Sequence, residues 1–324
     1  MRLLLVRHGE TVDNVAGIYA GVRDSALTTH GALQTVRLGA HLASNGVKIS
    51  HIYSSDLQRA VKTAEAIRLA QIPTPPETVE LKMLREQDFG WWEGKAIVKG
   101  GRETQRLQHC LDDGFKDIES KASQKERMET FITTHLLQHM QNRGDETVVV
   151  VAHGIILSYL WRTLLKRFEA KSVTVRPEVV LGDRGLDYMG GWSNTGYLDL
   201  EINHKPIQSA VNKQAETSDT VTVADSPFAV DKISTRPLSE AKATTVVDLN
   251  STLTSPMAII PSDAAAATTS SPSIELRDLL LVVKSVNNLE HLKGLKKTRG
   301  GIGSARHDDK QQTVDRFFKR QRTE

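Results

Sequence analysis

The feature that most constrains the fold is a pair of short aliphatic runs, each followed closely by a histidine and a glycine. Residues 3–6 read Leu-Leu-Leu-Val and lead to His8, while residues 148–151 are all valine and lead to His153. Runs of this length that stop at a glycine-containing segment are typical of buried strands entering a loop. We therefore expect both histidines just beyond the carboxyl end of a strand.

Strand-like and helix-like patterns alternate along the first part of the chain. Helices are predicted over residues 31–44, from the capping residues 54–56 to about residue 70, and over residues 124–142 and 155–165. Further strands are predicted at residues 51–53, 79–84 and 197–202. This alternation predicts an α/β fold, a three-layer sandwich in which helices flank a mainly parallel central sheet.

These predictions place several polar or titratable groups directly after a strand. They are His8, Ser54-Ser55, Glu86 and His153. The carboxyl ends of parallel strands share one edge of a sheet, and ligands bind there in open α/β sheets. The four segments are therefore expected to form one site.

The same groups suit the transfer of a phosphoryl group. A neutral imidazole such as that of His8 is a good nucleophile toward phosphorus. Arg7 and Arg59 can each hold phosphate oxygens through two parallel hydrogen bonds, and a helix N-terminus near Ser55 would add partial positive charge. Glu86 is a carboxyl group that could protonate the leaving alcohol and then activate water.

Five segments of the chain, in order, resemble the signature of the histidine phosphatase superfamily, which includes the cofactor-dependent phosphoglycerate mutases. They are Leu5-Val6-Arg7-His8-Gly9-Glu10-Thr11 with Asn14, Gly21 with Asp24-Ser25-Ala26-Leu27-Thr28 and Gly31, Ser54-Ser55-Asp56-Leu57 with Arg59-Ala60, Leu84-Arg85-Glu86 with Phe89-Gly90, and Val149-Val150-Val151-Ala152-His153-Gly154. The resemblance covers residues 1 to about 202 and implies a phosphoglycerate mutase-like fold.

Carried over residue by residue, the resemblance implies a role for each matching position. His8 would be the phosphorylated nucleophile and Glu86 the general acid. The implied phosphate ligands are Arg7, Arg59 and His153, and the implied further substrate contacts are Asn14 and the backbone around Gly21. The phosphatase branch of the family uses no metal and no organic cofactor.

The residues by themselves leave some assignments open. Glu80, Asp88 and Glu93 lie near Glu86 and are rival candidates for the acid, and Asn14 could simply cap a helix. The other histidines considered, at positions 30, 41, 51, 109, 135 and 139, share no spacing and are predicted to lie on the surface.

The chain departs from the mutases of this family in ways that favour a phosphatase. The stretch between Glu86 and His153 is short for a mutase, in which an insertion helps to enclose a bisphosphate. Residues 89–94 resemble the phosphatase branch, and Ile155 stands where a second glycine is frequent, which would narrow the pocket. A phosphoglycerate mutase-type phosphotransferase is the alternative.

The chain changes character after residue 205. Residues 1–205 form the expected catalytic domain, whereas residues 206–273 are rich in small and hydroxylated side chains and are predicted to be a disordered linker. Apolar residues at helical spacing predict a helix over residues 274–295. Residues 296–324 form a basic tail that is predicted to be disordered.

Within this tail, residues 311–318 resemble the motif by which proteins bind the sliding clamp of DNA replication, proliferating cell nuclear antigen. Val314, Phe317 and Phe318 would share one face of a helical turn, and Gln311 would bond at the edge of a groove. So short a pattern also arises by chance, and the basic residues could form a solvated charge run or contact DNA phosphates. A non-catalytic clamp- or chromatin-associated interaction protein is therefore the second class of function.

Composition restricts the cellular compartment and the kinds of partner more than it restricts the function. The 42 Lys+Arg residues nearly balance the 39 Asp+Glu residues, so overall charge predicts no nucleic-acid or membrane partner. Cys110 is the single cysteine, which excludes an intramolecular disulfide, and no run suits a membrane span or a signal peptide. We expect an intracellular protein, cytoplasmic or nuclear, that acts on phosphorylated small molecules or macromolecules.

Overall fold

The computed structural model describes residues 1–97, 102–179, 185–188, 190–205, 276–296 and 302–308. These residues belong to one compact unit, which joins Met1–Pro206 to Ser273–Glu324. The predicted linker over residues 206–273 and the clamp-like motif at residues 311–318 lie outside the described residues. No helix in the described ranges is long and apolar enough to cross a membrane.

The centre of the fold is a mixed, mainly parallel sheet of seven strands in the order β3-β2-β4-β1-β6-β7-β5. The strands are β1 (Arg2–Arg7), β2 (His51–Ser54), β3 (Val79–Glu80), β4 (Thr147–Ala152), β5 (Val173–Val175), β6 (Tyr197–His204) and β7 (Leu279–Asn288). Strands β1 to β4 pair in parallel, β6 runs antiparallel to β1 and β7, and β5 is parallel to β7. The predicted α/β fold class is confirmed.

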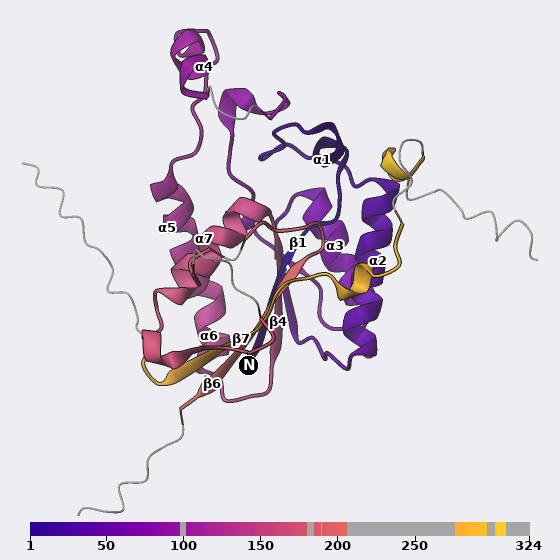
Figure 1. The fold of residues 1–324 in the computed structure, drawn as a ribbon, viewed down its shortest axis with the longest axis vertical. Coiled ribbons are helices and arrows are strands. Elements are labelled where there is room, and N and C mark those ends of the chain that lie inside the picture. Colours follow the sequence, from indigo (N-terminus) through magenta and orange to yellow (C-terminus); the bar gives the residue numbers. More distant parts are fainter. Residues whose placement is uncertain (98–101, 180–184, 189, 206–275, 297–301, 309–324) are drawn as a thin grey trace, which may run out of the picture. The chain divides into compact units, whose positions relative to one another are not determined.

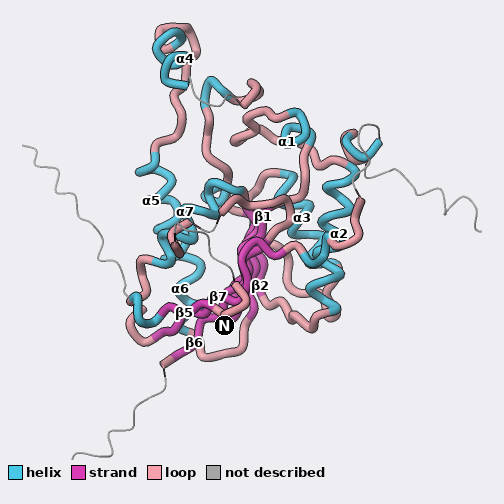
Figure 2. The backbone as a smooth tube through the Cα atoms, viewed as in Figure 1, coloured by secondary structure: helices cyan, strands magenta, loops and turns pink. Residues whose placement is uncertain are grey.

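Helices cover both faces of the sheet, as Figures 1 and 2 show. The α-helices of the described chain are α1 (Val12–Ala16), α2 (Thr29–Ser44), α3 (Gln58–Leu69), α4 (Arg102–His109), α5 (Lys121–Phe131), α6 (Leu137–Gln141) and α7 (Gly154–Leu165). Helices α2 and α3 pack on one face, and α5, α6 and α7 pack on the other. The helix predicted over residues 124–142 is present, with one π-helical stretch, Ile132–Leu136, between α5 and α6.

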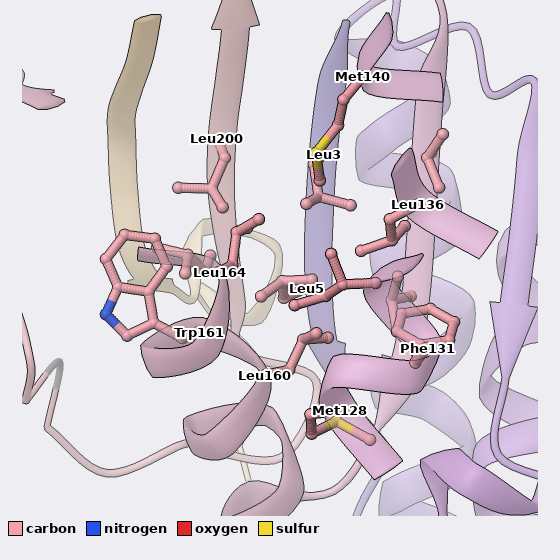
Figure 3. Packing of buried hydrophobic residues seen from close by; sticks show 14 of the residues in the cluster. Leu3, Leu5, Met128, Phe131, Leu136, Met140, Leu160, Trp161, Leu164 and Leu200 are labelled. Carbon is pink, nitrogen blue, oxygen red and sulfur yellow. The ribbon is translucent and has the colours of Figure 1, made fainter. Parts of the chain in front are cut away.

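The alternating side chains of β1 hold both helical layers to the sheet. Leu3 and Leu5 pack into the cluster formed with α5, α6 and α7 (Figure 3), whereas Leu4 and Val6 pack into the cluster formed with α2 and α3. All four side chains are fully buried. Burying one such side chain contributes roughly 1.5–3 kcal/mol, so β1 and the equally buried β4 form a stiff base for the loops that follow them.

The prediction of a helix over residues 274–295 is wrong. Residues Leu279–Asn288 form the strand β7, and a short 3₁₀ turn, Glu290–Leu292, follows it. Leu279, Leu281 and Val283 alternate into the core, which is the spacing of a strand. The physical reason is long-range: β6 has an open edge whose backbone groups need partners, and β7 supplies them. The compact unit therefore does not end at residue 205.

Other differences lie in short or polar segments. The strand predicted over residues 79–84 shortens to Val79–Glu80, followed by a 3₁₀ turn, Lys82–Leu84. Helix α4 and strand β5 were not predicted, because α4 carries hardly any apolar residues and β5 is too short to show a period. The prediction that the remaining histidines lie on the surface is wrong for His139, which is buried.

Candidate active site

The site gathers at one end of the sheet, which we call the carboxyl edge: the end at which β1, β2, β3 and β4 finish. These four strands are neighbours and run in parallel, so the segments after them emerge side by side. His8 follows β1, Ser55 follows β2 and His153 follows β4. Glu86 comes two residues after the 3₁₀ turn that follows β3.

His8 is buried and held in one tautomer. Its Nδ1 lies 2.7 Å from the carbonyl oxygen of Gly9, and because a carbonyl can only accept, Nδ1 carries the hydrogen and donates it. The lone pair of the ring is then on Nε2. Gly9 is itself fixed, because its N–H donates to Thr63 Oγ1 and a side chain at this position would meet the Gly31 carbonyl at 2.8 Å.

His153 lies beside His8, with the two ring centroids 5.0 Å apart. Nδ1 of His153 accepts a hydrogen bond from Nε of Arg59 at 3.1 Å, so the hydrogen of the neutral ring must be on Nε2. Among the described residues that Nε2 is buried and has no hydrogen-bond partner. His153 therefore presents a buried N–H donor with nothing from the protein to receive it.

Arg59 is almost fully buried at the start of α3 and is oriented by the loop that precedes α2. Its two terminal nitrogens donate to the carbonyl oxygens of Arg23 at 2.6 Å and Gly21 at 2.7 Å. Gly21 has a φ of 53°, and an added Cβ would collide with the carboxylate of Glu93. The structure thus places the predicted Gly21 against Arg59.

Arg7 approaches the site from the end of β1. Its Nη1 donates to the carbonyl oxygen of Trp192 at 2.5 Å, while its Nε is buried without a partner in the described part of the chain. Asn194, in the same loop as Trp192, donates to the carbonyl oxygen of His8 and to Oδ1 of Asn14. Asn14 is also part of a capping box with Thr11, so the structure shows it in a supporting position.

Glu86 caps the N-terminus of α7. Its two carboxylate oxygens accept hydrogen bonds from the backbone N–H groups of Ile155 and Ile156, each at 3.1 Å. This contact fixes the carboxylate next to the turn that carries His153. Two of the three rivals are engaged elsewhere: Asp88 pairs with Lys116, and Glu93 accepts from the backbone N–H groups of Val22 and Phe89. The third, Glu80, is an exposed residue of β3.

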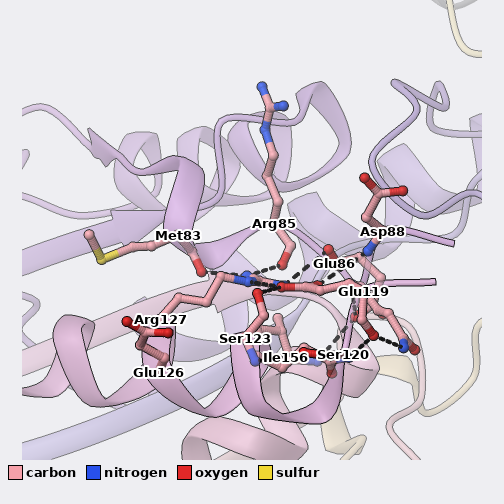
Figure 4. Close-up of polar contacts among 12 residues, drawn as sticks. Met83, Arg85, Glu86, Asp88, Glu119, Ser120, Ser123, Glu126, Arg127 and Ile156 are labelled. Atoms are coloured by element: carbon pink, nitrogen blue, oxygen red, sulfur yellow. Dashed lines mark hydrogen bonds and ion pairs between the residues drawn. The ribbon is translucent and has the colours of Figure 1, made fainter. Parts of the chain in front are cut away.

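Arg127, on α5, holds the loop that carries Glu86 (Figure 4). Its guanidinium donates to the carbonyl oxygens of Met83, Arg85 and Glu86 and makes a two-pronged ion pair with Glu119. All five N–H donors of an arginine are thereby used. Sequence reasoning missed Arg127, because nothing in its local pattern distinguishes it from a surface arginine.

Burial and neighbouring positive charge set the protonation of the site. Burial, followed by the charges of Arg59 and Arg7, lowers the pKa of His8 well below its usual range. Burial and then Arg59 do the same to the pKa of His153. Burial lowers the pKa of Arg59 to about 10, against the opposing charge of Glu86. At neutral pH both imidazoles are therefore neutral and both arginines remain cationic.

A pocket of about 410 Å³ opens beside this cluster. Arg7 and Glu86 lie at its wall, together with residues of α7 and of the loop before β6. The other lining residues are Gly154, Ile155, Ser158, Tyr159, Arg162, Tyr188, Gly190, Gly191 and Trp192. The pocket offers aromatic surface, hydroxyl groups and, in addition to Arg7, the cation Arg162.

Support for the loop after Trp192 comes from the far end of the chain. Oδ1 of Asn287, at the end of β7, accepts from the N–H of Ser193 at 2.9 Å, and its Nδ2 donates to Oγ of Ser193. Thr195 contacts Nε2 of His291 at 2.8 Å. These supporting residues could not be found from the sequence, because they come from the segment that was predicted to be a separate helix.

Comparisons with known proteins identify the family that the chain resembles. A sequence model of the histidine phosphatase superfamily (branch 1) matches residues 3–175. A probable phosphatase of Schizosaccharomyces pombe is 31% identical over 203 residues, which is 62% of this chain and 64% of the relative. A probable phosphoglycerate mutase of Proteus mirabilis is 34% identical over 173 residues, 51% of this chain and 75% of the relative.

Among solved structures, Bacillus stearothermophilus YhfR is similar, with 26% identity and a TM-score of 0.47 over 62% of this chain and 91% of that one. The chain spans less than two thirds of the length of the fission-yeast relative.

Proposed function

This chain belongs to branch 1 of the histidine phosphatase superfamily, and from that premise we propose that it is a phosphomonoester hydrolase that works through a phosphohistidine at His8. The coarse class, a phosphatase or mutase of this superfamily, follows from membership. Hydrolysis rather than mutase transfer, the residue roles and the partner are our proposal.

One observation carries the proposal: two buried donors lie beside a neutral nucleophile. Nε2 of His153 and Nε of Arg7 have no partner within the described residues. A buried donor without a partner costs about 1–3 kcal/mol. Such atoms also occur elsewhere in the described chain, and what sets these two apart is that both lie beside the neutral imidazole of His8. A phosphate has three oxygens to receive them and the negative charge that Arg7 and Arg59 require.

The chemistry follows from the positions of the groups. The cycle begins with Glu86 in its protonated form. The Nε2 lone pair of His8 attacks phosphorus, the bond to the ester oxygen breaks, and Glu86 gives its proton to the leaving alcohol. Glu86 then takes a proton from water, whose oxygen attacks phosphorus and breaks the bond to Nε2. His8 is regenerated and inorganic phosphate leaves. Arg7, Arg59 and His153 hold the phosphoryl oxygens throughout.

Two features of the chain support hydrolysis over transfer to a second hydroxyl group. The stretch between Glu86 and His153 lacks room for a large enclosing insertion, and residues 89–94 resemble the phosphatase branch. The pocket of about 410 Å³ suits small phosphomonoesters or an exposed phosphorylated side chain of a macromolecule. A mutase would return the phosphoryl group to a hydroxyl group of its substrate and release little phosphate.

The test is rapid-quench detection of a phosphoenzyme with a panel of phosphate monoesters. We expect an acid-labile phosphoenzyme that decays to inorganic phosphate in the wild-type chain and in a control, His109→Ala, which alters an exposed histidine. His8→Ala should form none. Phosphoenzyme in His8→Ala would disprove the nucleophile, and transfer to a second hydroxyl group without phosphate release would establish the mutase.

We propose further that the tail recruits the enzyme to the DNA sliding clamp through Gln311, Val314, Phe317 and Phe318. The support is the residue pattern, together with basic residues on both sides of it. Replacing Phe317 and Phe318 by alanine should abolish binding to the clamp without changing phosphatase turnover, whereas Thr313→Ala should change neither. Equal clamp binding by the double variant would remove this part of the proposal.

A further inference from the structure

A second histidine cluster lies at the opposite end of the sheet, which we call the amino edge: the end at which β2 and β4 begin. His51 is the first residue of β2, Glu146 directly precedes β4, and His139 comes from α6. One nitrogen or oxygen atom from each of the three side chains lies within 4.8 Å of the other two. The proposed phosphatase chemistry uses none of them.

Specific contacts hold the side chains of His139 and Glu146 in place. Nδ1 of His139 lies 2.8 Å from Oε2 of Glu146, and Nε2 lies 2.9 Å from the hydroxyl group of Tyr53. The other oxygen of Glu146 accepts from Nδ2 of Asn142 at 2.7 Å. His139 and Glu146 are thus both held by a partner outside the cluster.

His51 differs from its two neighbours in having no such partner. In the described part of the chain its ring makes no hydrogen bond, and it contacts the ring of His139 with centroids 4.4 Å apart. It is half-buried, and the side chain of Glu146 is 23% exposed, so the cluster is open to solvent on one side. An ion could therefore enter without any change in the core.

We propose that His51, His139 and Glu146 form a binding site for a divalent transition metal ion, best suited to Zn²⁺. Two imidazole nitrogens and one carboxylate oxygen are the donor set that zinc takes in three-ligand sites, with a fourth position left for water. Calcium and magnesium prefer sites built from oxygen atoms and would bind this set poorly.

The outer contacts match what a metal-binding imidazole needs. When an ion replaces the proton between Nδ1 of His139 and Glu146, Nε2 of His139 carries the hydrogen and donates it to the oxygen of Tyr53. A hydroxyl group can accept as well as donate, so Tyr53 serves both states. Outer partners of this kind fix ring orientation and raise metal affinity, and Asn142 does the same for the carboxylate.

Binding requires a modest rearrangement of the cluster. Zinc ligands at about 2.0–2.1 Å in a tetrahedron lie about 3.4 Å from one another. Nδ1 of His139 and Oε2 of Glu146, now 2.8 Å apart, must separate slightly, and the ring nitrogen of His51, now within 4.8 Å of both, must reach the same distance. The half-buried His51 can supply most of this movement by turning about its side-chain bonds. The ion would then join β2, α6 and the turn before β4, three elements that are far apart in the sequence.

The experiment uses the full chain, freed of metal and titrated with Co²⁺ and Zn²⁺. We expect one equivalent of Co²⁺ to give the visible absorption of a four- or five-coordinate site, Zn²⁺ to displace it, and Zn²⁺ to raise the melting temperature. His51→Ala and Glu146→Gln should weaken the affinity about 10- to 100-fold or more. His135→Ala, which alters a neighbouring histidine outside the ligand set, should bind as the wild-type chain does.

Two results would overturn the proposal. One is a wild-type chain that takes up no metal at micromolar concentrations. The other is equal affinity in His51→Ala, which would show that the ion binds elsewhere, for instance at His8 and His153. Because His51 makes no hydrogen bond in the described structure, its alanine variant should fold, and circular dichroism would check this before the titration.

Discussion

Two pairs of histidines lie at opposite ends of the same sheet, and the charged groups beside them are of opposite sign. At the carboxyl edge, the rings of His8 and His153 are 5.0 Å apart, and at the amino edge those of His51 and His139 are 4.4 Å apart. The pairs are alike in side-chain type and in spacing. The charges and hydrogen-bond partners around them make the difference.

The first pair is surrounded by donors. Arg59 donates to His153, Arg7 lies alongside, and the pKa of each histidine is lowered by burial and then by these arginines. The second pair has a carboxylate, Glu146, in contact with His139. An imidazole among arginines can bind or attack an anion, whereas an imidazole beside a carboxylate can share a cation with it. Neighbouring charge, more than the histidines, selects the chemistry of each end.

The largest effect that tests this contrast is expected when the unpartnered Nε2–H group of His153 is removed from the carboxyl edge. His153→Ala removes the N–H proposed to bind the phosphoryl oxygen in the transition state, and kcat should fall about 100- to 1,000-fold. His51→Ala, the matched change at the amino edge, should leave kcat unchanged. Steady-state kinetics on one phosphomonoester would measure both, and an equal loss in the two variants would erase the distinction between the pairs.

A smaller effect is expected when the loop that carries Glu86 loses its support from Arg127. Arg127→Met frees the carbonyl oxygens of Met83, Arg85 and Glu86, so Glu86 should be less well placed and kcat should fall about 10- to 100-fold. The loss should be greater for alkyl phosphates, whose leaving groups need a proton, than for aryl phosphates with good leaving groups.

The matched control for this change is Arg106→Met, which breaks exposed ion pairs with Glu103 and Asp117 but removes no hydrogen bond to the carbonyl groups of the loop that carries Glu86. It should change kcat little for either kind of substrate. If Arg127→Met lowered kcat by the same factor for both kinds of leaving group, Arg127 would support the fold and not the position of Glu86.

The dependence of stability on pH gives a third test. The folded pKa of His153 lies below the unfolded value of about 6.5, so its contribution to stability is complete above that pH and is lost as pH falls below it. Between about pH 7.5 and about pH 5.5, the wild-type chain should lose about 1.4 kcal/mol more stability than His153→Gln. Urea unfolding in phosphate-free buffer would measure this, and parallel pH profiles would mean that His153 can be protonated in the folded state.

The smallest expected effect is that of a chelator on turnover. The chemistry proposed at the carboxyl edge uses only protein groups, so EDTA should leave kcat and KM unchanged. It should at the same time lower the melting temperature of a zinc-loaded wild-type chain to that of His51→Ala. A clear loss of turnover with EDTA, reversed by metal, would mean that the catalytic chemistry also depends on a cation.

The sequence by itself was enough to predict the α/β fold and the grouping of His8, Ser54-Ser55, Glu86 and His153. Both follow from local patterns: a buried parallel strand shows as a continuous aliphatic run, and the residue after it must lie at the carboxyl edge. The order of strands then brings the groups together without any detail of packing. Spacing along the chain carried that information.

Tertiary structure decided the rest, because it depends on which distant segments meet. The segment whose apolar spacing predicted a helix forms β7 instead, because it pairs with the edge of β6. This long-range pairing outweighs the local pattern. Arg127 and Asn287 support the site through backbone carbonyl and N–H groups that any sequence possesses. His51, His139 and Glu146 share no spacing and meet only because β2, β4 and α6 pack at one end of the sheet.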